Sequence, residues 1–527
     1  MLSVHLHFLL FFGLTWWMWI LIILVIIAIR DVFFNRKHTI SHNFPIAGHI
    51  RYMLENIGPE LRQYIVANNR EELPFNRSQR TWIYASAKKE NNYQGFGTDQ
   101  DQSSPNFVLI KPELMPFPIK EGHPNHADPY FIPSAKVIGL THDRKRPYRP
   151  RSVINIGAMS YGSLSKAAIS ALNKGSMMAG NYHNTGEGGL SPYHSFGADV
   201  CFQFGTGYFG VRDKAGNFSL DKLVELVQGN SFVRLIEVKL SQGAKPGKGG
   251  VLPATKITAE IAGIRHVEMG KDVISPSYHK AFSNVREMVS FIELIATETG
   301  LPVGIKSAVG KLDMWHDLLT IMKNENIGPD FIAIDGGEGG TGAAPPSFAN
   351  HVSLPFIYGF SEVYKLVQEY GLTNDITMIA SGKLGFPSRA AMAFAMGADV
   401  VHVAREAMMS IGCIQAQVCH TNRCPTGIAT QSKWLQSGID VPLKSLRFAQ
   451  YVNSFRKEFL EITHACGYEH PSQFTMEDIK LSMGDNNYTL TLDEIFAYQK
   501  DIVPMTGLKE FMDCQYLGAP PTSASNK

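Results

Sequence analysis

The sequence lacks an excess of charge of either sign. Its 527 residues carry 49 Lys and Arg against 47 Asp and Glu, a formal net charge of +2. Proteins that coat nucleic acid usually carry a large basic excess, so nucleic acid is not expected as a partner. Six cysteines are too few for a secreted scaffold stapled by disulfides. The 44% hydrophobic and 18% charged composition excludes a mainly disordered chain and predicts a large buried core.

The sequence has only one long apolar run. The run FLLFFGLTWWMWILIILVIIAI (Phe8–Ile29) holds no charged residue, and as a helix of about 33 Å it could cross a ~30 Å hydrocarbon core. A signal peptide is the alternative, but it would need Lys or Arg before the run, whereas Arg30, Arg36 and Lys37 follow it. We predict a single-pass transmembrane anchor at residues 1–30, with the body of the protein in the cytoplasm.

A third absence is the full Rossmann fingerprint, in which a G-x-G-x-x-G follows a strand, opens the next helix and has an acidic residue downstream. The sequence therefore does not support direct binding of NAD(P)H.

Beyond the anchor, the chain divides by texture into three regions. Residues 31–135 are polar and are expected to form an irregular lead-in, and residues 466–527 a helical tail. In residues 136–465, β-branched runs alternate with amphipathic stretches, which indicates βα units and a parallel sheet. The eight runs are Val153–Ala158, Met178–His183, Cys201–Phe204, Leu235–Leu240, Val303–Lys306, Phe331–Ile334, Ile376–Ala380 and Val400–Ala404.

Eight βα units predict an α/β fold, a (β/α)8 TIM barrel preceded by the transmembrane helix. A doubly wound sheet is the main alternative. The barrel is favoured because functional-looking residues end nearly every run, as a site at the C-terminal rim requires.

The residues after the seventh and eighth runs suggest a phosphate site. Gly382 and Lys383 follow the seventh run, and Arg405 follows the eighth. In many barrels these two loops hold a phosphate, which glycine N–H groups and cations stabilise. After the sixth run, the glycine-rich segment containing Gly340 and Thr341 favours close approach to a flat or charged ligand. For the residues after the seventh and eighth runs, the alternative is helix caps with solvated charges. For the glycine-rich segment, the alternative is a flexible loop.

The fourth and fifth runs lead to residues suited to negative charge. Lys306 ends the fifth run and would point into the barrel mouth, where it could stabilise a reduced ring; a surface salt bridge is the alternative. Gln242 and Lys245 lie in a Lys- and Gly-rich stretch after the fourth run that suits a carboxylate. Glu187 adds a carboxylate on a glycine-rich turn. These stretches could also be a solvated basic loop and an ordinary turn.

Three cysteines form the most specific chemical signal. Cys413, Cys419 and Cys424 follow the spacing C-x5-C-x4-C, with Pro425 after the last. Clustered thiolates in a cytoplasmic protein more often bind metal than form disulfides. A zinc site completed by His420 is one reading. A final Cys-Pro recurs in ferredoxin-type runs, and three ligands suit a three-iron cluster.

Together these elements resemble the FMN-binding synthase domain of the glutamate synthase family. The matching runs occur in the family's order: GAMSYGSLSKAA (157–168), NTGEGG (184–189), QFGTGYFG (203–210), EVKLSQGAKPGKGGVLPATK (237–256), ISP (274–276), GGTGAAP (339–345) and GCIQAQVCHTNRCPTGIATQ (412–431). The resemblance implies a barrel that holds FMN beside a [3Fe-4S] cluster. It also implies reduction of 2-iminoglutarate, formed from 2-oxoglutarate and ammonia, to L-glutamate.

The resemblance assigns roles to residues by motif. Lys306 and Glu187 are the expected catalytic residues, and Gln242, Lys245 and Lys256 match the region expected to receive 2-oxoglutarate. Cys413, Cys419 and Cys424 match the cluster ligands. The residues expected to contact FMN are Ala158, Met159, Ser160, Gln203, Lys306, Gly340, Thr341, Gly382, Lys383 and Arg405.

The chain also departs from the family. The N-terminal glutaminase domain and the C-terminal β-helix domain of the large enzymes have no counterpart, so we expect ammonia delivered from elsewhere. The electron donor is expected to be external, a ferredoxin or a reductase subunit. Two alternatives remain open: a cofactor-bearing electron-transfer subunit, and a related synthase acting on another amine or 2-oxo acid.

Overall fold

The computed structural model describes residues 16–34, 38–118, 130–484 and 488–504. By its internal contacts the chain divides into two compact units, Met1–Arg80 and Thr81–Lys527. Each unit is described by itself.

The first unit begins with the apolar run. Helix α2 (Trp16–Ile29) continues into the π-helix η1 (Arg30–Phe34), and the two form a helix of 19 residues with a mean hydropathy of 2.4. By length and composition it could cross a membrane, the single such helix in the part of the chain that the structure describes. Residues 8–15 of the predicted run lie outside the described residues.

The segment expected to be irregular contains helices instead. They are α3 (Thr39–Asn43), α4 (Ala47–Leu61), the π-helix η2 (Arg62–Val66) and α5 (Arg77–Lys88). The expectation gave weight to the polar residues and missed the apolar ones spaced at helical intervals, such as Ile50, Leu54, Ile57 and Leu61.

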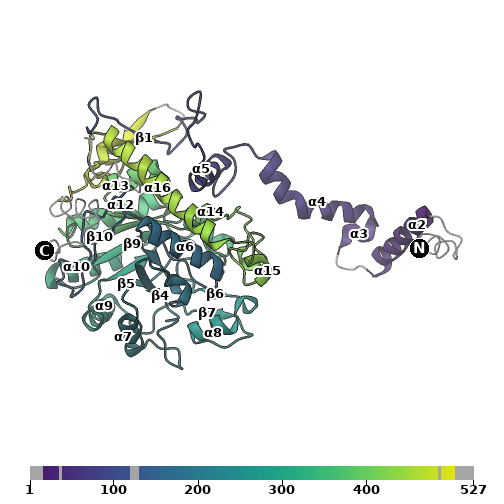
Figure 1. Ribbon diagram of the computed structural model, residues 1–527, viewed down its shortest axis with the longest axis horizontal. Helices are drawn as coiled ribbons and strands as arrows, with labels where there is room; N and C mark the ends of the chain where they lie inside the picture. The colour runs from purple at the N-terminus through teal and green to yellow at the C-terminus, as the bar shows by residue number, and fades with distance from the viewer. Residues whose placement is uncertain (1–15, 35–37, 119–129, 485–487, 505–527) are drawn as a thin grey trace. The chain divides into compact units, whose positions relative to one another are not determined.

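The second unit is built on a closed barrel of eight parallel strands (Figure 1). Strand β11 pairs with β2, which closes the sheet and excludes the doubly wound alternative. The predicted barrel is confirmed. In order around the barrel the strands are β2 (Ile154–Ile156), β3 (His183–Asn184), β4 (Val200–Phe204), β5 (Val233–Lys239), β8 (Val303–Ser307), β9 (Phe331–Asp335), β10 (Thr377–Ser381) and β11 (Val400–Val403).

Each predicted run overlaps one of these strands, although the second does so only at its end. Residues from Met178 to Ala179 still belong to helix α6 (Lys166–Ala179). Gly180 ends that helix in the left-handed conformation, with φ 71°, which glycine adopts without the steric cost of a side chain. Only His183 of the run reaches β3.

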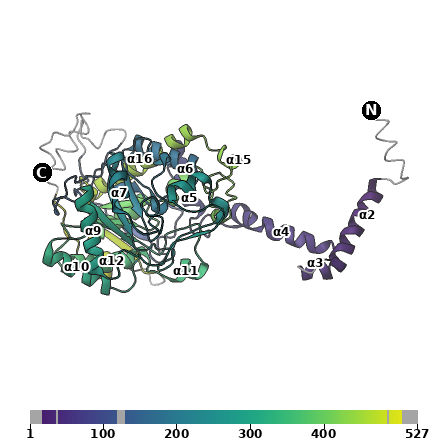
Figure 2. The same ribbon diagram turned by 90° about the horizontal axis from the view of Figure 1, so that it is seen from below.

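Helices surround the strands, as both views show (Figures 1 and 2). Helix α16 packs along α6 and also contacts α13 and α14. Besides α6, the α-helices are α7 (Leu220–Gly229), α8 (Ala259–Arg265), α9 (Val285–Thr299), α10 (Asp313–Glu325), α11 (Pro346–His351), α12 (Phe356–Glu369), α13 (Pro387–Ala395), α14 (Arg405–Ser410), α15 (Lys433–Gln436) and α16 (Val441–Ala465). Short 3-10 turns include η4 (Gly186–Gly188), η5 (Pro192–His194), η6 (Ala254–Lys256), η7 (Cys419–Thr421), η8 (Pro471–Gln473) and η9 (Met476–Asp478).

The N-terminal half of the barrel is filled by apolar and aromatic side chains. Ile138 and Tyr148 form an isolated antiparallel bridge, and both belong to a buried cluster with Leu235, Phe331 and Val400. This packing closes one end of the barrel. Inside the barrel, Glu237, Lys306 and Asp335 lie in the C-terminal parts of β5, β8 and β9, the end at which barrel enzymes have their sites.

The region expected to be a helical tail is mixed. After α16, strands β12 (Ile479–Ser482) and β13 (Thr489–Thr491) form a three-stranded antiparallel sheet with β1 (Val108–Ile110), and α17 (Leu492–Phe496) follows. A second small sheet pairs β6 (Val251–Leu252) with β7 (Val273–Ile274). Strands this short carry little periodicity, and the partner of β12 lies far away in sequence, so the tail pattern did not reveal them.

Candidate active site

Charged side chains converge at the C-terminal end of the barrel because of the alternation within strands. In β5, Glu237 and Lys239 are two residues apart, so both point to the same side of the sheet. Lys239 lies opposite Lys306 of β8, and Glu237 opposite Gln203 of β4. The barrel interior thus receives several charges within a few ångströms of one another.

Lys306 is buried, with only 6% of its surface exposed. Its Nζ lies 3.5 Å from Oδ2 of Asp335, the last residue of β9. Burial acts to lower the pKa of Lys306, but the carboxylates of Asp335 and Glu237 outweigh it and hold the pKa above its ordinary value. Lys306 is therefore a permanent cation inside the barrel, and the alternative of a surface salt bridge is wrong.

Asp335 is held as an anion by three contacts. Burial acts to raise its pKa, but Lys306, the backbone N–H of Gly243 and the hydroxyl of Ser381 lower it overall. The Gly243 N–H donates to Oδ2 at 2.9 Å, and Ser381 Oγ donates to Oδ1 at 2.9 Å. A Cβ at position 243 would come within 1.8 Å of the Gly336 carbonyl oxygen. Only glycine allows this contact between the loops after β5 and β9.

Glu237 is the most deeply buried carboxylate of the group. Its Oε1 accepts from Asn184 Nδ2 at 2.9 Å and from Gln203 Nε2. Its Oε2 has no hydrogen-bond partner among the described residues. Burial raises the pKa of this carboxyl despite the nearby Lys306. A buried polar atom without a partner calls for a ligand or water.

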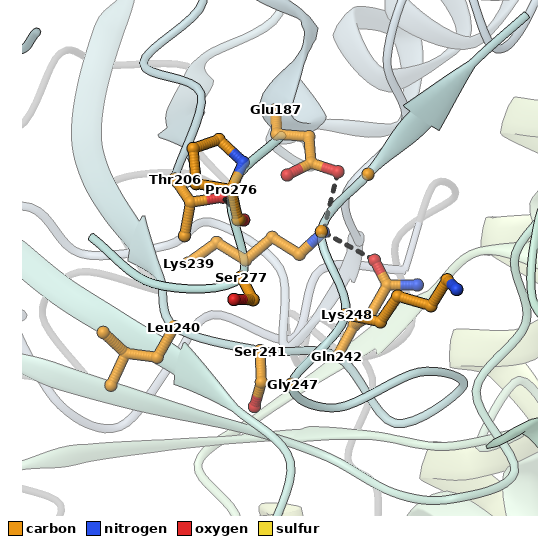
Figure 3. Close-up of a pocket in the computed structure, with 12 residues that line it drawn as sticks. Glu187, Thr206, Lys239, Leu240, Ser241, Gln242, Gly247, Lys248, Pro276 and Ser277 are labelled. Atoms are coloured by element: carbon orange, nitrogen blue, oxygen red, sulfur yellow. Dashed lines mark hydrogen bonds and ion pairs between the residues drawn. The ribbon is translucent and has the colours of Figure 1, made fainter. Parts of the chain in front are cut away.

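A pocket of about 310 Å3, its open mouth included, lies beside Lys239 (Figure 3). Its lining combines the end of β5 with the loops that follow β3, β4 and β7. The lining residues are Glu187, Thr206, Lys239, Leu240, Ser241, Gln242, Gly247, Lys248, Gly249, Gly250, Pro276 and Ser277.

Within this pocket, Lys239 joins two of the predicted residues. Its Nζ lies 3.0 Å from Oε1 of Glu187 and donates to Oε1 of Gln242 at 2.5 Å (Figure 3). Burial acts to raise the pKa of Glu187, but Lys239, Lys245 and Arg265 lower it overall. The pocket therefore offers cations and an amide around an ionised glutamate. This is an arrangement that can bind a carboxylate and orient a second polar group.

Lys245 and Lys256 lie outside the pocket lining. Lys245 Nζ donates to the carbonyl oxygens of Gly249 and Ala343, at 3.3 and 3.2 Å. Lys256 Nζ donates to those of Ser163 and Cys419, at 3.2 and 2.7 Å. Lys245 is thus close enough to Glu187 to help lower its pKa. Lys256 contacts the cysteine loop instead.

Three cations gather near the C-terminal ends of β10 and β11: Lys383 in the loop after β10, Arg389 on α13 and Arg405 at the start of α14. Burial lowers the pKa of Lys383 to about 8, helped by the nearby charges of Arg389 and Arg405. The guanidinium of Arg405 donates to the Glu338 carbonyl oxygen. A Cβ at Gly340 would lie 2.8 Å from the Arg405 side chain, so the glycine leaves room for that cation. The carboxylates of Glu406 and Glu338 offset part of this charge, and the remaining positive charge favours an anion.

The remaining predicted FMN contacts lie in the loops after β2 and β9. The segment Ala158–Ser160 follows β2, where Met159 N donates to the Asn184 carbonyl oxygen at 3.2 Å and Ser160 Oγ to Ser163 Oγ at 2.9 Å. Gly340 and Thr341 are exposed in the loop after β9. A Cβ at the next residue, Gly342, would lie 3.3 Å from Cys419 Cβ, so this loop borders the cysteine loop.

The three cysteines share one loop after α14. Burial and the nearby Cys424 raise the pKa of Cys419, and Lys256 lies close enough to both thiols to interact with them. Burial acts to raise the pKa of Cys424, but the Thr426 hydroxyl and backbone N–H groups lower it overall. The Tyr84 hydroxyl donates to the Cys413 carbonyl oxygen at 2.8 Å.

The five cysteines of the described residues form no disulfide with one another. Across the described ranges, no three His, Cys, Asp or Glu side chains are close enough to hold a metal ion, so the cluster stays a prediction.

The comparisons with known proteins bear directly on this arrangement. A family model described as the conserved region in glutamate synthase matches residues 123–469. The chain belongs to the glutamate synthase family. The glutamate synthase large subunit-like protein YerD of Bacillus subtilis is 39% identical, with 84% of this chain and 90% of that protein covered. The archaeal glutamate synthase [NADPH] of Methanocaldococcus jannaschii is 34% identical over 60% of this chain.

The relatives also differ in extent. The chain covers about three-fifths of the archaeal protein, 59% of its length. Among solved structures, a mandelate oxidase aligns with a TM-score of 0.39 and 13% identity, covering 77% of this chain and 90% of that one. A flavocytochrome b2 with benzoylformate aligns with a TM-score of 0.41 and 11% identity, covering 86% and 92%.

Within this member of the glutamate synthase family, sequence reasoning left several site residues unassigned. Lys239 and Glu237 could have been found, because two charges at i and i+2 in an apolar strand must share a face. Asp335 directly follows the predicted sixth run and ends β9, a position comparable to that of Lys306 near the end of β8. Arg389 gave no such signal, because it lies within a helix and only the tertiary structure brings it to Lys383.

Proposed function

We propose that the chain is a membrane-anchored FMN and iron–sulfur oxidoreductase that converts 2-oxoglutarate and ammonia to L-glutamate. The observation that carries this proposal is the pocket of Lys239, Glu187 and Gln242 beside the buried cation Lys306. The backbone N–H of Leu240, in the pocket wall, donates to the Lys306 carbonyl oxygen at 2.9 Å. The proposed pocket for a dicarboxylate and the proposed site for negative charge thus lie on the neighbouring strands β5 and β8.

The described residues offer contacts for two parts of one FMN, its phosphate and its ring. The cations Lys383, Arg389 and Arg405 would hold its phosphate, since loops after the last two barrel strands commonly do so. The unpartnered Oε2 of Glu237 would accept a hydrogen bond near its ring. FMN, when bound, would supply the hydride for the imine carbon.

The cysteine loop fits an iron–sulfur cluster by its chemistry. Cys413, Cys419 and Cys424 would be its ligands, and hydrogen-bond donors around Cys424 favour the thiolate that ligation requires. The cluster, when bound, would supply single electrons from an external donor, a ferredoxin or a reductase subunit. The loop after β9 supports electron transfer between the two groups, because it contacts both of their proposed sites. Gly342 in this loop lies next to Cys419, and Gly340 lies next to Arg405.

The protein's own residues then bind, orient and stabilise charge. Lys239 and Gln242 would hold a substrate carboxylate, and Lys248 adds a second cation at the exposed side of the pocket. Glu187 fixes the position of Lys239. Lys306 keeps its proton, so it would stabilise negative charge facing the barrel mouth. Nitrogen would arrive as ammonia, and the apolar N-terminal helix would anchor the chain in the membrane.

We expect purified protein with bound FMN to form L-glutamate from 2-oxoglutarate, ammonium and a chemical reductant, and not from glutamine. Lys239→Met should raise the KM for 2-oxoglutarate roughly tenfold or more, because a charge-assisted hydrogen bond is worth about 1.5–3 kcal/mol. Lys280→Met, at an exposed lysine, is the matched control. Glutamate formation from glutamine by the purified chain would contradict the nitrogen source. No glutamate from ammonium, with FMN bound, would reject the proposed reaction.

A second test uses the pH dependence of FMN binding. In the ligand-free protein Lys383 loses its proton above pH about 8, whereas an unfolded lysine keeps it to about pH 10.4. A bound phosphate favours the charged form, so binding takes up a proton above pH 8. The Kd for FMN should therefore rise between pH 7 and 9.5, by at most about tenfold per unit.

Fluorescence titration of the FMN-free protein measures this effect. Lys383→Met should bind FMN more weakly at pH 7 and lose the dependence. Riboflavin, which lacks the phosphate, is the matched control ligand and should show no such dependence. Equal pH profiles for FMN and riboflavin would place the phosphate elsewhere.

A further inference from the structure

The segment between the apolar helix and the barrel unit carries an exposed apolar stripe. At ~100° per residue its members on α4 fall within an arc of about 100°, and its last two members lie on the π-helix η2. The stripe consists of Ile50 (56% exposed), Met53 (55%), Leu54 (51%), Ile57 (43%), Leu61 (39%), Tyr64 (51%) and Ile65 (74%). The other face carries Arg51, Glu55, Glu60 and Arg62. Figure 2 shows α4 as one continuous helix.

The start of α4 is fixed to the end of the apolar helix. Asp31, one residue after Arg30 in η1, is fully buried, and its Oδ2 lies 2.7 Å from His49 Nε2 on α4. The backbone N–H of Ile46 donates to the same oxygen at 3.5 Å. The short helix α3 contacts both η1 and α4. The stripe therefore begins where the candidate membrane span ends.

We propose that α4 and η2 lie in the membrane interface, with the apolar stripe sunk among the lipid acyl chains and the charged face in the headgroup layer. The proposal rests on the membrane anchor of the proposed function. Continuity with the span selects lipid as the occupant: a helix start held at the bilayer surface brings its apolar face to the nearest apolar phase. The segment of 20 residues would cover about 30 Å of that surface.

The charge of the segment defines the kind of lipid. Its charged face carries two arginines and two glutamates, and Arg51 Nη1 donates to Glu55 Oε2 at 3.0 Å. There is no basic excess to select anionic headgroups. Burial of apolar side chains therefore dominates, and neutral lipid suffices.

Photo-crosslinking of the full chain in phosphatidylcholine vesicles, with a clickable acyl chain on the lipid, tests the proposal. A p-benzoylphenylalanine is placed singly at Leu54 on the stripe, at Glu55 on the charged face, or at Ile23 within the span. We expect lipid adducts at Leu54 at least about fivefold above those at Glu55, unchanged by 0.5 M salt.

The Leu54 result decides the proposal whatever Ile23 shows. Lipid adducts at Leu54 and Ile23, with few at Glu55, support both the interfacial helix and the anchor. Adducts at Ile23 without any at Leu54 overturn the interfacial helix and leave the anchor intact. A Leu54 adduct to a second copy of the chain, or to another part of the same chain, also overturns it. Absence of lipid adducts at Ile23 rejects the anchor alone.

Discussion

Lys306→Met is expected to lower turnover of 2-oxoglutarate and ammonium about tenfold or more, which corresponds to ~1.4 kcal/mol of transition-state stabilisation. Methionine keeps roughly the length of the side chain and removes its charge. The Lys306 ammonium is buried, and the carboxylates of Asp335 and Glu237 keep it protonated. A fixed cation in a place shielded from water stabilises developing negative charge far better than water-exposed lysines do. The reduction potential of the bound flavin should fall as well.

The same substitution also disturbs the fold, and the design must separate the two effects. It leaves Asp335 without its cation, and breaking a buried ion pair costs about 3–5 kcal/mol. Lys306→Arg keeps the charge and should retain more turnover than Lys306→Met at equal loss of thermal stability. Lys311→Met, at an exposed lysine nearby, should change neither turnover nor potential. Unchanged turnover and potential in Lys306→Met would reduce Lys306 to a structural partner of Asp335.

The barrel could be predicted from sequence because its strands are short apolar runs of regular spacing. The run at Phe331–Ile334, for example, became β9 with one added residue. The helices before the barrel could not, because α4 has an exposed apolar face and a polar one, and in a polar context that pattern resembled a loop. The sheet of β1, β12 and β13 depends on pairing between Val108 and Leu481, which no local pattern records.

The positions of Lys306 in β8 and of Glu187 in the turn after β3 agree with the expectation that both lie at the barrel mouth, whereas their roles stay predictions. Pairings across strands could not be predicted: the ion pair of Lys239 with Glu187 links β5 to the loop after β3, and the distance along the chain hides it. Lys256 shows the converse. Its motif pointed to the substrate region, while its Nζ reaches the Cys419 carbonyl oxygen because η6 and η7 meet in the folded chain.

Cys419→Ser is the substitution with the largest expected effect on metal content. Cys419 lies in the turn η7, its carbonyl oxygen is held by Lys256 Nζ at 2.7 Å, and its Cβ would face a Cβ at Gly342. A serine hydroxyl fits the same space but does not ionise near neutral pH, and only the thiolate is an effective ligand. Iron and acid-labile sulfide should therefore be lost, while FMN remains, since its phosphate would be held at Lys383 and Arg405.

The matched control is Cys466→Ser, because Cys466 is also buried and free but lies outside the loop. It should retain iron, sulfide and FMN. Iron and sulfide analysis, with the flavin spectrum of the same sample, measures all three. Stoichiometric zinc without iron or sulfide in the parent protein would contradict the cluster and favour the zinc site with His420, and His420→Ala would then release the zinc. Retained iron in Cys419→Ser would show that this thiol is not a ligand. The Lys256 hydrogen bond would then serve only to fasten the cysteine loop to η6.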